Sequence, residues 1–186
     1  MLDYIYNFSN DWLNNIKIKI MLKTKDQLKN KTFLVYGFGK SGKACFNYLN
    51  KKNNLKIYDD KNLNVKNKYK KYFVSKKEIK NLNFDFIIIS PGINIKNCTL
   101  KNYLKNNQNK IINELDIFYF NNKKNTKITI TGTNGKSTTS KLIYEILKKH
   151  GKDARLVGNI GNPLLNETNI SLNTIFVIEA SSYQIE

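Results

Sequence analysis

Short apolar runs alternate with helix-like stretches along the chain from Lys31 onward. The runs TFLVYG, LKIYDD and FDFIIIS are typical of buried strands, whereas SGKACFNYLNKK, between the first two runs, is typical of a helix. Further along, LKNYLKNN and ELDIFYF predict helical segments on either side of a short strand at KIIN. Strands and helices that alternate at this spacing predict an α/β fold, built on a parallel sheet with helices on both faces.

The same alternation restarts after a polar stretch at residues 121–126, which has no apolar periodicity and is the best candidate for a linker. KITITG, ARLVG and TIFVIEA predict strands, and the stretch between Gly135 and Gly151 predicts a helix. We therefore expect an N-terminal extension at residues 1–30, a first domain at residues 31–122 and a second domain at residues 126–186. The extension has enough apolar residues for one amphipathic helix, although their spacing is imperfect and assigns it no role.

A glycine-rich loop opens the first domain. Gly37, Gly39 and Gly42 form G-x-G-x-x-G between a predicted strand and a predicted helix, where backbone N–H groups at the helix start can bind a phosphate. Asp59 and Asp60 end the next strand about 20 residues on, at the position where an acid meets a ribose hydroxyl in a Rossmann-like domain. On these residues alone the loop predicts an NAD site, and the alternative is a turn that serves packing only.

A second glycine-rich loop opens the second domain, at Gly132-Thr133-Asn134-Gly135-Lys136-Ser137-Thr138. Its backbone N–H groups would cradle phosphates, the lysine would reach the β and γ oxygens, and Ser137 would hold Mg²⁺. The loop departs from G-x-x-x-x-G-K-[ST], because its first glycine lies only three residues before the second. Glu179 ends a later strand, where its carboxylate could meet a Mg²⁺ held by Ser137, and Asn159 lies in a glycine-framed turn.

The composition narrows the alternatives. The net charge of +18 suggests a nucleic-acid-binding module, but the lysines are spread over the chain, and an aromatic RNA-binding signature and a zinc pattern are both missing. Two distant cysteines without metal-ligand spacing fit a reducing cytoplasm. The apolar runs are far shorter than the roughly 18 residues of a membrane span, and the first residues do not form a secretory signal.

Five short motifs together resemble the Mur ligase family. They are GFGKSG in the first loop, SPGI at residues 90–93, TGTNGKST in the second loop, GNIG at residues 158–161 and EASSYQIE at residues 179–186. Within the family they are most similar to the ligases that add D-glutamate. The resemblance implies that the first loop holds a UDP-linked substrate rather than NAD, and that the second loop holds ATP.

Carried over position by position, the resemblance assigns the substrate to Gly37, Gly39, Lys40, Ser41, Gly42, Asp60 and Lys61, and ATP to Gly132, Thr133, Asn134, Gly135, Lys136, Ser137, Thr138 and Thr139. It assigns Mg²⁺ to Ser137 and Glu179, and catalytic roles to Lys136, Asn159 and Glu179. Two residues depart from the family pattern. Asp60 stands where a small hydroxyl residue is familiar, which puts that contact in doubt, and Ala180 stands where leucine is usual.

The resemblance also implies the reaction. A monomeric cytoplasmic enzyme would use ATP and Mg²⁺ to convert the carboxylate of UDP-N-acetylmuramoyl-L-alanine into an acyl phosphate, which the D-glutamate amine attacks during peptidoglycan precursor synthesis. An NAD-dependent dehydrogenase and a nucleic-acid-binding module are the alternatives. Since family members continue well beyond residue 186, we expect a truncated chain in which residues 126–186 begin a central ATP-binding domain. We also expect this segment to lack strands and helices that would cover its apolar strands on both faces, and therefore to be only marginally ordered.

Overall fold

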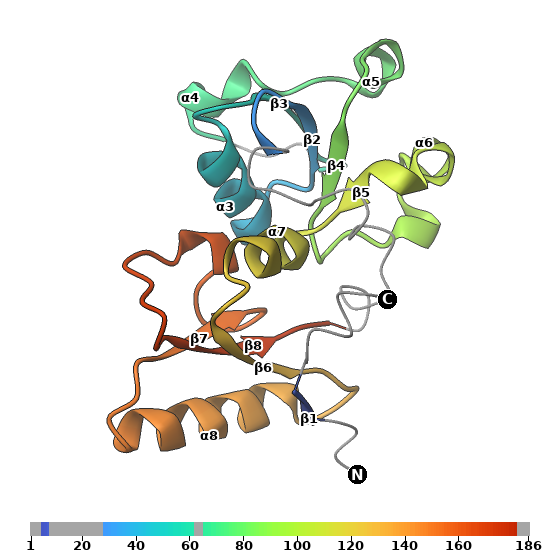
Figure 1. Ribbon diagram of the computed structural model, residues 1–186. Coiled ribbons are helices and arrows are strands. Elements are labelled where there is room, and N and C mark those ends of the chain that lie inside the picture. The colour runs from blue at the N-terminus through green and yellow to red at the C-terminus, as the bar shows by residue number, and fades with distance from the viewer. Residues whose placement is uncertain (1–4, 8–27, 62–64, 182–186) are drawn as a thin grey trace.

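The computed structural model of the protein describes residues 5–7, 28–61 and 65–181 (Figure 1). Its backbone contains two four-stranded sheets. The first has the order β3-β2-β4-β5 with all neighbours parallel, and consists of β2 (Thr32–Tyr36), β3 (Asn54–Tyr58), β4 (Phe86–Ile89) and β5 (Ile111–Ile112). The second has the order β1-β6-β8-β7, and consists of β1 (Ile5–Asn7), β6 (Thr126–Ile130), β7 (Ala154–Gly158) and β8 (Ile175–Glu179).

The second sheet is parallel except at its edge. β8 lies between β6 and β7 and runs parallel to both, whereas β1 pairs with β6 in the antiparallel direction, Ile5 opposite Ile130. The predicted parallel α/β fold is therefore confirmed in both halves of the chain. The helix considered for the N-terminal extension is wrong at Ile5–Asn7, which form a strand, and residues 1–4 and 8–27 lie outside the described residues.

Helices cover both faces of the first sheet. α3 (Lys40–Leu49) packs on one face, where Phe33 and Val35 of β2 point, and α4 (Asn67–Lys70) lies on the same side. α5 (Lys76–Asn81) and α6 (Lys101–Asn106) cover the other face through Ile79 and Leu104. Single 3₁₀ turns, η2 (Ile95–Asn97) and η3 (Gln108–Lys110), flank α6. The alternating side chains of one strand thus enter two cores.

Two helices cover the second sheet from opposite sides, α7 (Glu114–Asn121) and α8 (Lys136–Lys149) (Figure 1). On α7, the Phe118 ring packs edge-on against Phe176 of β8, with ring centroids 4.7 Å apart. The expected lack of cover is therefore wrong, since helices lie on both sides of this sheet. Because α7 precedes residue 126, the pattern of the second segment alone did not reveal it.

The apolar core is continuous from one sheet to the other. Phe33 and Val35 of the first sheet belong to the same buried cluster as Phe176 and Ile178 of the second, and α7 lies between them. α7 begins with a capping box in which Asn113 and Asp116 bond each other's backbone N–H groups. It ends at Asn121, and β6 begins at Thr126, so the predicted linker is the short turn between these two elements.

Candidate functional site

The first glycine loop is packed tightly at two of its three glycines. Gly37 has φ +89°, and a Cβ there would lie 2.8 Å from Cβ of Ser90, in the SPGI motif. A Cβ on Gly42 would lie 2.0 Å from the carbonyl oxygen of Gly37, whereas Gly39 has nothing within 4 Å of its Cβ position. The loop therefore has the expected division of labour: a turn glycine, an open glycine that a ligand can approach, and a glycine that lets the helix come close.

The two acids after β3 have different roles in the structure. Asp59 accepts hydrogen bonds from the backbone N–H groups of Phe38 (2.7 Å) and Lys61 (2.9 Å), so its carboxylate braces the loop and is engaged on both oxygens. Asp60 accepts one bond, from the Tyr36 hydroxyl at 2.6 Å, and is exposed at the carboxyl end of the sheet. Burial, with the hydrogen bond to Asp60, raises the pKa of Tyr36. Lys40 and Lys61 are exposed near the same loop.

Ser41 points away from the loop and toward the second sheet. Its hydroxyl donates to the carboxylate of Glu114, at the start of α7. The other oxygen of Glu114 accepts from the backbone N–H of Leu165 at 3.0 Å, in the 3₁₀ turn η4 (Leu164–Asn166). The sequence analysis did not single out Glu114, and its one signal was an acid within the apolar run IINELDIFYF.

The second glycine loop lies between β6 and α8. Gly135 has φ +76° and caps the helix, and the backbone N–H of Thr139 donates to its carbonyl oxygen to begin the helical ladder. The ammonium of Lys136 donates to the carbonyl oxygens of Gly132 (2.7 Å) and Thr133 (3.3 Å), so it lies across the loop. Exposed residues make up most of the loop: Thr133, Asn134, Gly135, Ser137 and Thr138.

Three strand ends bring the remaining predicted residues together. Glu179 is paired with Ile130 of β6 on one side and with Gly158 of β7 on the other, so it occupies the centre of the carboxyl edge. The backbone N–H of Asn159 donates to the carbonyl oxygen of Glu179 at 2.9 Å. The approach is so close that a Cβ on Gly158 would lie 2.3 Å from that oxygen. Ligands of parallel α/β sheets bind at such an edge.

Three buried polar atoms near this edge have no hydrogen-bond partner among the residues that the structure describes. They are Oγ1 of Thr131, Oγ of Ser140 and Oε2 of Glu179. Glu179 is 5% exposed, and a buried carboxylate oxygen without a partner is costly. A Mg²⁺ ion fits such a place, because it takes one or two carboxylates and completes its shell with hydroxyls, phosphates and water. Within the described ranges no three His, Cys, Asp or Glu residues gather into a metal cluster.

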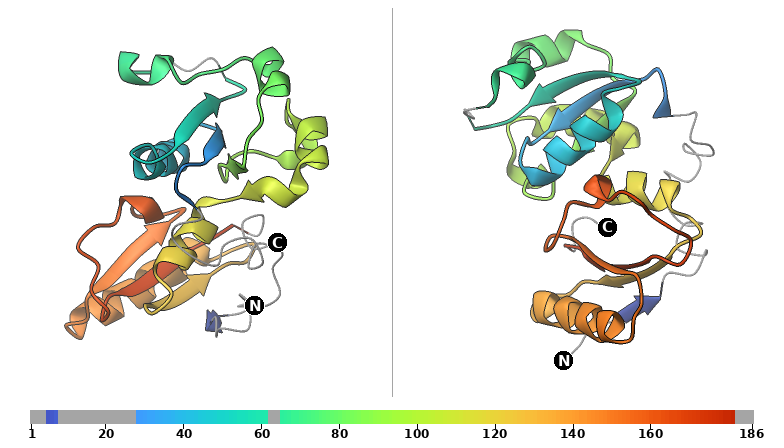
Figure 2. Two further views of the ribbon diagram at one scale, coloured as in Figure 1. Left: turned by 45° about the horizontal axis from the view of Figure 1, so that its top comes forward. Right: turned by 90° about the vertical axis from the view of Figure 1, so that its left-hand side faces the viewer.

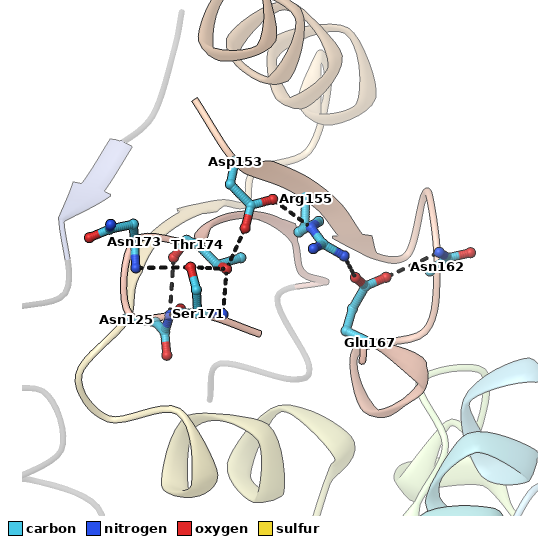
Figure 3. A network of polar contacts seen from close by, with 8 residues as sticks. All are labelled: Asn125, Asp153, Arg155, Asn162, Glu167, Ser171, Asn173 and Thr174. Atoms are coloured by element: carbon cyan, nitrogen blue, oxygen red, sulfur yellow. Dashed lines mark hydrogen bonds and ion pairs between the residues drawn. The ribbon is translucent and has the colours of Figure 1, made fainter. Parts of the chain in front are cut away.

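The turn after β7 is held by a polar network (Figure 3). The backbone N–H of Gly158 donates to the carbonyl oxygen of Asn162, and the Asn162 side chain donates to Glu167 at 3.0 Å. Arg155 joins Glu167 to Asp153, at 3.2 and 2.9 Å, and the Thr174 hydroxyl donates to Asp153 at 2.6 Å. Through Glu167 and Arg155, the network therefore connects the turn that carries Asn159 to the residues just before β7 and β8.

Among the described helices, none is long and apolar enough to cross a membrane. Residues 130–186 match a known family, the Mur ligase middle domain. The match begins at the last residue of β6 and includes the second glycine loop, Asn159 and Glu179.

Most of the chain is similar to bacterial proteins named UDP-N-acetylmuramoylalanine–D-glutamate ligase. The protein of Rickettsia bellii (strain RML369-C) is 37% identical over 163 residues, which cover 85% of this chain and 35% of that protein. That of Caldicellulosiruptor bescii is 36% identical over 170 residues, covering 86% and 37%. That of Clostridioides difficile (strain 630) is 31% identical over 172 residues, covering 86% and 38%. The chain thus spans about a third of the length of the curated relatives it matches.

A solved structure is also similar, that of the UDP-N-acetylmuramate:L-alanyl-gamma-D-glutamyl-meso-diaminopimelate ligase from Neisseria meningitides. It is 15% identical, with a TM-score of 0.48, and the match covers 83% of this chain and 55% of that one.

Proposed function

Because this chain belongs to the Mur ligase family, we propose that it serves an ATP-dependent ligase that adds D-glutamate to UDP-N-acetylmuramoyl-L-alanine in peptidoglycan precursor synthesis. The single observation that carries the proposal is at the second sheet. The glycine loop with Lys136 adjoins a strand end at which Glu179 holds a buried carboxylate oxygen that has no hydrogen-bond partner among the described residues. Phosphate needs the loop and a divalent cation needs the carboxylate, so the two features together favour Mg²⁺·ATP.

In this proposal each residue has one task. Lys136 leaves the loop carbonyls and contacts the β and γ phosphates, where an ammonium offsets the charge that develops on transfer. Ser137 and Glu179 hold Mg²⁺, which neutralises phosphate charge when bound. Asn159 lies beside Glu179 on the substrate side. The substrate carboxylate forms a bond to the γ-phosphorus and ADP leaves. The D-glutamate amine then attacks the acyl carbon, loses a proton, and phosphate leaves.

At the first sheet we propose that the open Gly39 and the start of α3 receive the diphosphate of the UDP moiety. Asp60 and Lys61 lie at the far end of this site, next to the nucleoside, whereas Asp59 is engaged by the loop. This arrangement also fits NAD, and the relatives' names support UDP. We further propose a monomer in a reducing cytoplasm, where Cys45 and Cys98 remain free thiols.

Calorimetric titration of the chain with UDP, NAD and a Mg²⁺-bound non-hydrolysable ATP analogue tests the proposal. We expect UDP to bind more tightly than NAD, and the ATP analogue to bind only with Mg²⁺ present. Tighter binding of NAD than of UDP would contradict the ligase proposal and favour a dehydrogenase. A duplex or single-stranded oligonucleotide that binds more tightly than either nucleotide would favour the nucleic-acid module instead.

A further inference from the structure

One buried carboxylate lies between the two halves of the molecule. Glu114, at the first position of α7, is 3% exposed. It accepts a hydrogen bond from the Ser41 hydroxyl on α3 and another from the Leu165 backbone N–H in η4, at 3.0 Å. In the right-hand view of Figure 2, α7 and the orange-red turn η4 lie side by side beneath α3. The Glu114 side chain therefore bonds α3, which packs on the first sheet, and η4, which follows β7 of the second sheet.

Because this carboxylate is buried, its two hydrogen bonds matter for its stability. Burial raises the pKa of Glu114, while the bonds from Ser41, Leu165 and Leu164 oppose that shift. A buried carboxylate is costly without hydrogen-bond donors, so the loss of either donor disfavours this arrangement. Apolar contacts such as Phe118 on Phe176 hold the halves together but have no fixed direction. The two hydrogen bonds do have a direction, and they select one relative placement.

Each bond leads directly to one of the two glycine-framed sites. Ser41 lies inside the first glycine loop, between Gly39 and Gly42. Leu165 follows the turn that carries Asn159, and Asn162 and Glu167 hold that turn in place through Arg155. Among the described residues, the Glu114 carboxylate thus links the first loop by hydrogen bonds to the 3₁₀ turn that follows the turn with Asn159.

We infer that Glu114 is a positioning residue that sets the placement of the substrate loop relative to the ATP edge. The inference rests on the proposed function, in which a substrate held at the first loop must bring its carboxylate to a phosphate held at the second. Reacting atoms need to approach within about 3–3.5 Å, and a misplacement of about 1 Å can cost a hundredfold in rate. Glu114 acts through Ser41 and Leu165 and does not itself touch either ligand.

A native thiol reports on this contact. Cys45 is fully buried on α3, and burial, followed by the charge of Glu114, raises the pKa of its thiol well above the usual value. In a Cys98→Ser background, the rate of Cys45 alkylation by N-ethylmaleimide measures how often α3 separates from α7 and η4. We expect Glu114→Ala to raise this rate at least tenfold. Glu114→Gln should stay within about threefold of the parent, because its amide still accepts from Leu165 and bonds Ser41.

The matched control is Asp116→Asn, in the same helical turn. Asp116 accepts from the Asn113 backbone N–H within the cap of α7, so its hydrogen bond stays inside its own helix and does not lead to α3 or η4. We expect its alkylation rate to stay near that of the parent, with urea unfolding of each variant recording global stability. An unchanged rate in Glu114→Ala, or an equal increase in Asp116→Asn, would overturn the inference.

A second arm asks whether the placement matters for the ligands. In the parent chain, saturating UDP should raise the affinity for the Mg²⁺-bound ATP analogue at least threefold. In Glu114→Ala this mutual effect should vanish, while UDP alone binds within about threefold of the parent. Persistence of the mutual effect in Glu114→Ala would refute the positioning role. If the parent binds neither nucleotide, the proposed function fails, and the alkylation arm still decides whether Glu114 holds the two halves in place.

Discussion

The two glycine loops follow the same plan of strand, loop and helix, but they differ in how far their polar atoms are satisfied. Around the first loop, Asp59 bonds two backbone N–H groups, Ser90 donates to the Gly37 carbonyl, and Ser41 donates to Glu114. Around the second, three buried oxygens have no partner among the described residues, and Lys136 bonds carbonyls of its own loop.

This difference shows what each loop is built to receive. A loop whose polar atoms are already paired can recognise a ligand mainly through backbone N–H groups and shape, without reorganisation. A loop with unpaired buried oxygens gains most from a ligand that supplies a cation and competing acceptors. Under the proposed function, we therefore expect the first site to be pre-formed and the second to be completed by its ligand.

The largest expected effect is a difference in stability between alanine variants of the tightly packed Gly42 in the first loop and the open Gly135 in the second. Gly42→Ala would place a Cβ 2.0 Å from the Gly37 carbonyl, so α3 has to move away, and we expect a loss of about 3 kcal/mol in unfolding free energy. Gly135→Ala has open space and suffers only the strain of φ +76°, about 1 kcal/mol. Urea unfolding measures both. Equal losses would mean that the first loop is no more tightly packed than the second.

Next in size is the lysine of the second loop. Lys136→Ala removes a charged contact to phosphate, which is typically worth about 1.5–3 kcal/mol, so the ATP analogue should bind at least tenfold more weakly. Lys141→Ala, exposed on the same helix, is the control and should change the affinity less than twofold. Calorimetry in Mg²⁺ measures both affinities. An unchanged affinity in Lys136→Ala would show that this loop does not bind the phosphates.

Replacing the carboxylates of Asp59 and Glu179 by amides should change the unfolding free energy in opposite directions. Asp59→Asn loses one of two charge-assisted bonds and should destabilise the chain by about 1–2 kcal/mol. Glu179→Gln removes a buried carboxylate with one oxygen that no described residue bonds, and should stabilise the ligand-free chain by up to about 1 kcal/mol.

The stabilising change should also abolish the Mg²⁺ dependence of ATP-analogue binding, because the amide is a poor ligand for the ion. Thermal unfolding with and without Mg²⁺, alongside calorimetry, records both effects. A destabilised Glu179→Gln chain would show that this carboxylate already has its partners without a cation.

The smallest effect is a pH dependence in the second sheet. Lys127 is 9% exposed, donates to the Asn125 carbonyl at 2.8 Å and lies over the Tyr119 ring, and burial lowers its pKa to about 8. The unfolded chain keeps this proton up to about pH 10.4. Between these values the unfolded state binds more protons, so stability should rise with pH, by about 1 kcal/mol after allowance for solvent screening.

Urea unfolding between pH 7.5 and 9.5 would detect this rise. In Lys127→Met the slope of stability against pH over this range should flatten relative to the parent. A parent chain whose stability falls as the pH increases would contradict the assignment of the buried ammonium.

Much of the fold was readable from local pattern, because strands, glycine loops and helix starts depend on neighbouring residues. The parallel direction of the strands and both loop-to-helix junctions followed from apolar runs and glycine spacing, whereas the order of the strands was not predicted. The cover that α7 gives the second sheet did not, since it joins residues on both sides of the predicted boundary. The short helices α4 and α5 were also missed, because four and six residues are too few for a periodic signal.

The candidate site divides in the same way. The sequence placed the second loop and Glu179 at strand ends, as the structure has them, because each ends or follows a predicted strand; their roles as ligands stay a prediction. The separate roles of Asp59 and Asp60 were not, because two adjacent acids look alike until the backbone shows which one turns inward. The Ser41–Glu114 contact spans 73 positions, and no local pattern encodes such a pair.

The network beside Asn159 has a consequence for the composition of the chain. Arg155 is the only arginine among 32 lysine and arginine residues, so positive charge elsewhere is carried by lysine. At this position the guanidinium directs Nε to Asp153 and Nη1 to Glu167 at the same time. A compact ammonium offers no such planar fork. A chain that uses lysine almost everywhere thus has arginine where the shape of the cation, rather than its charge, holds a turn in place.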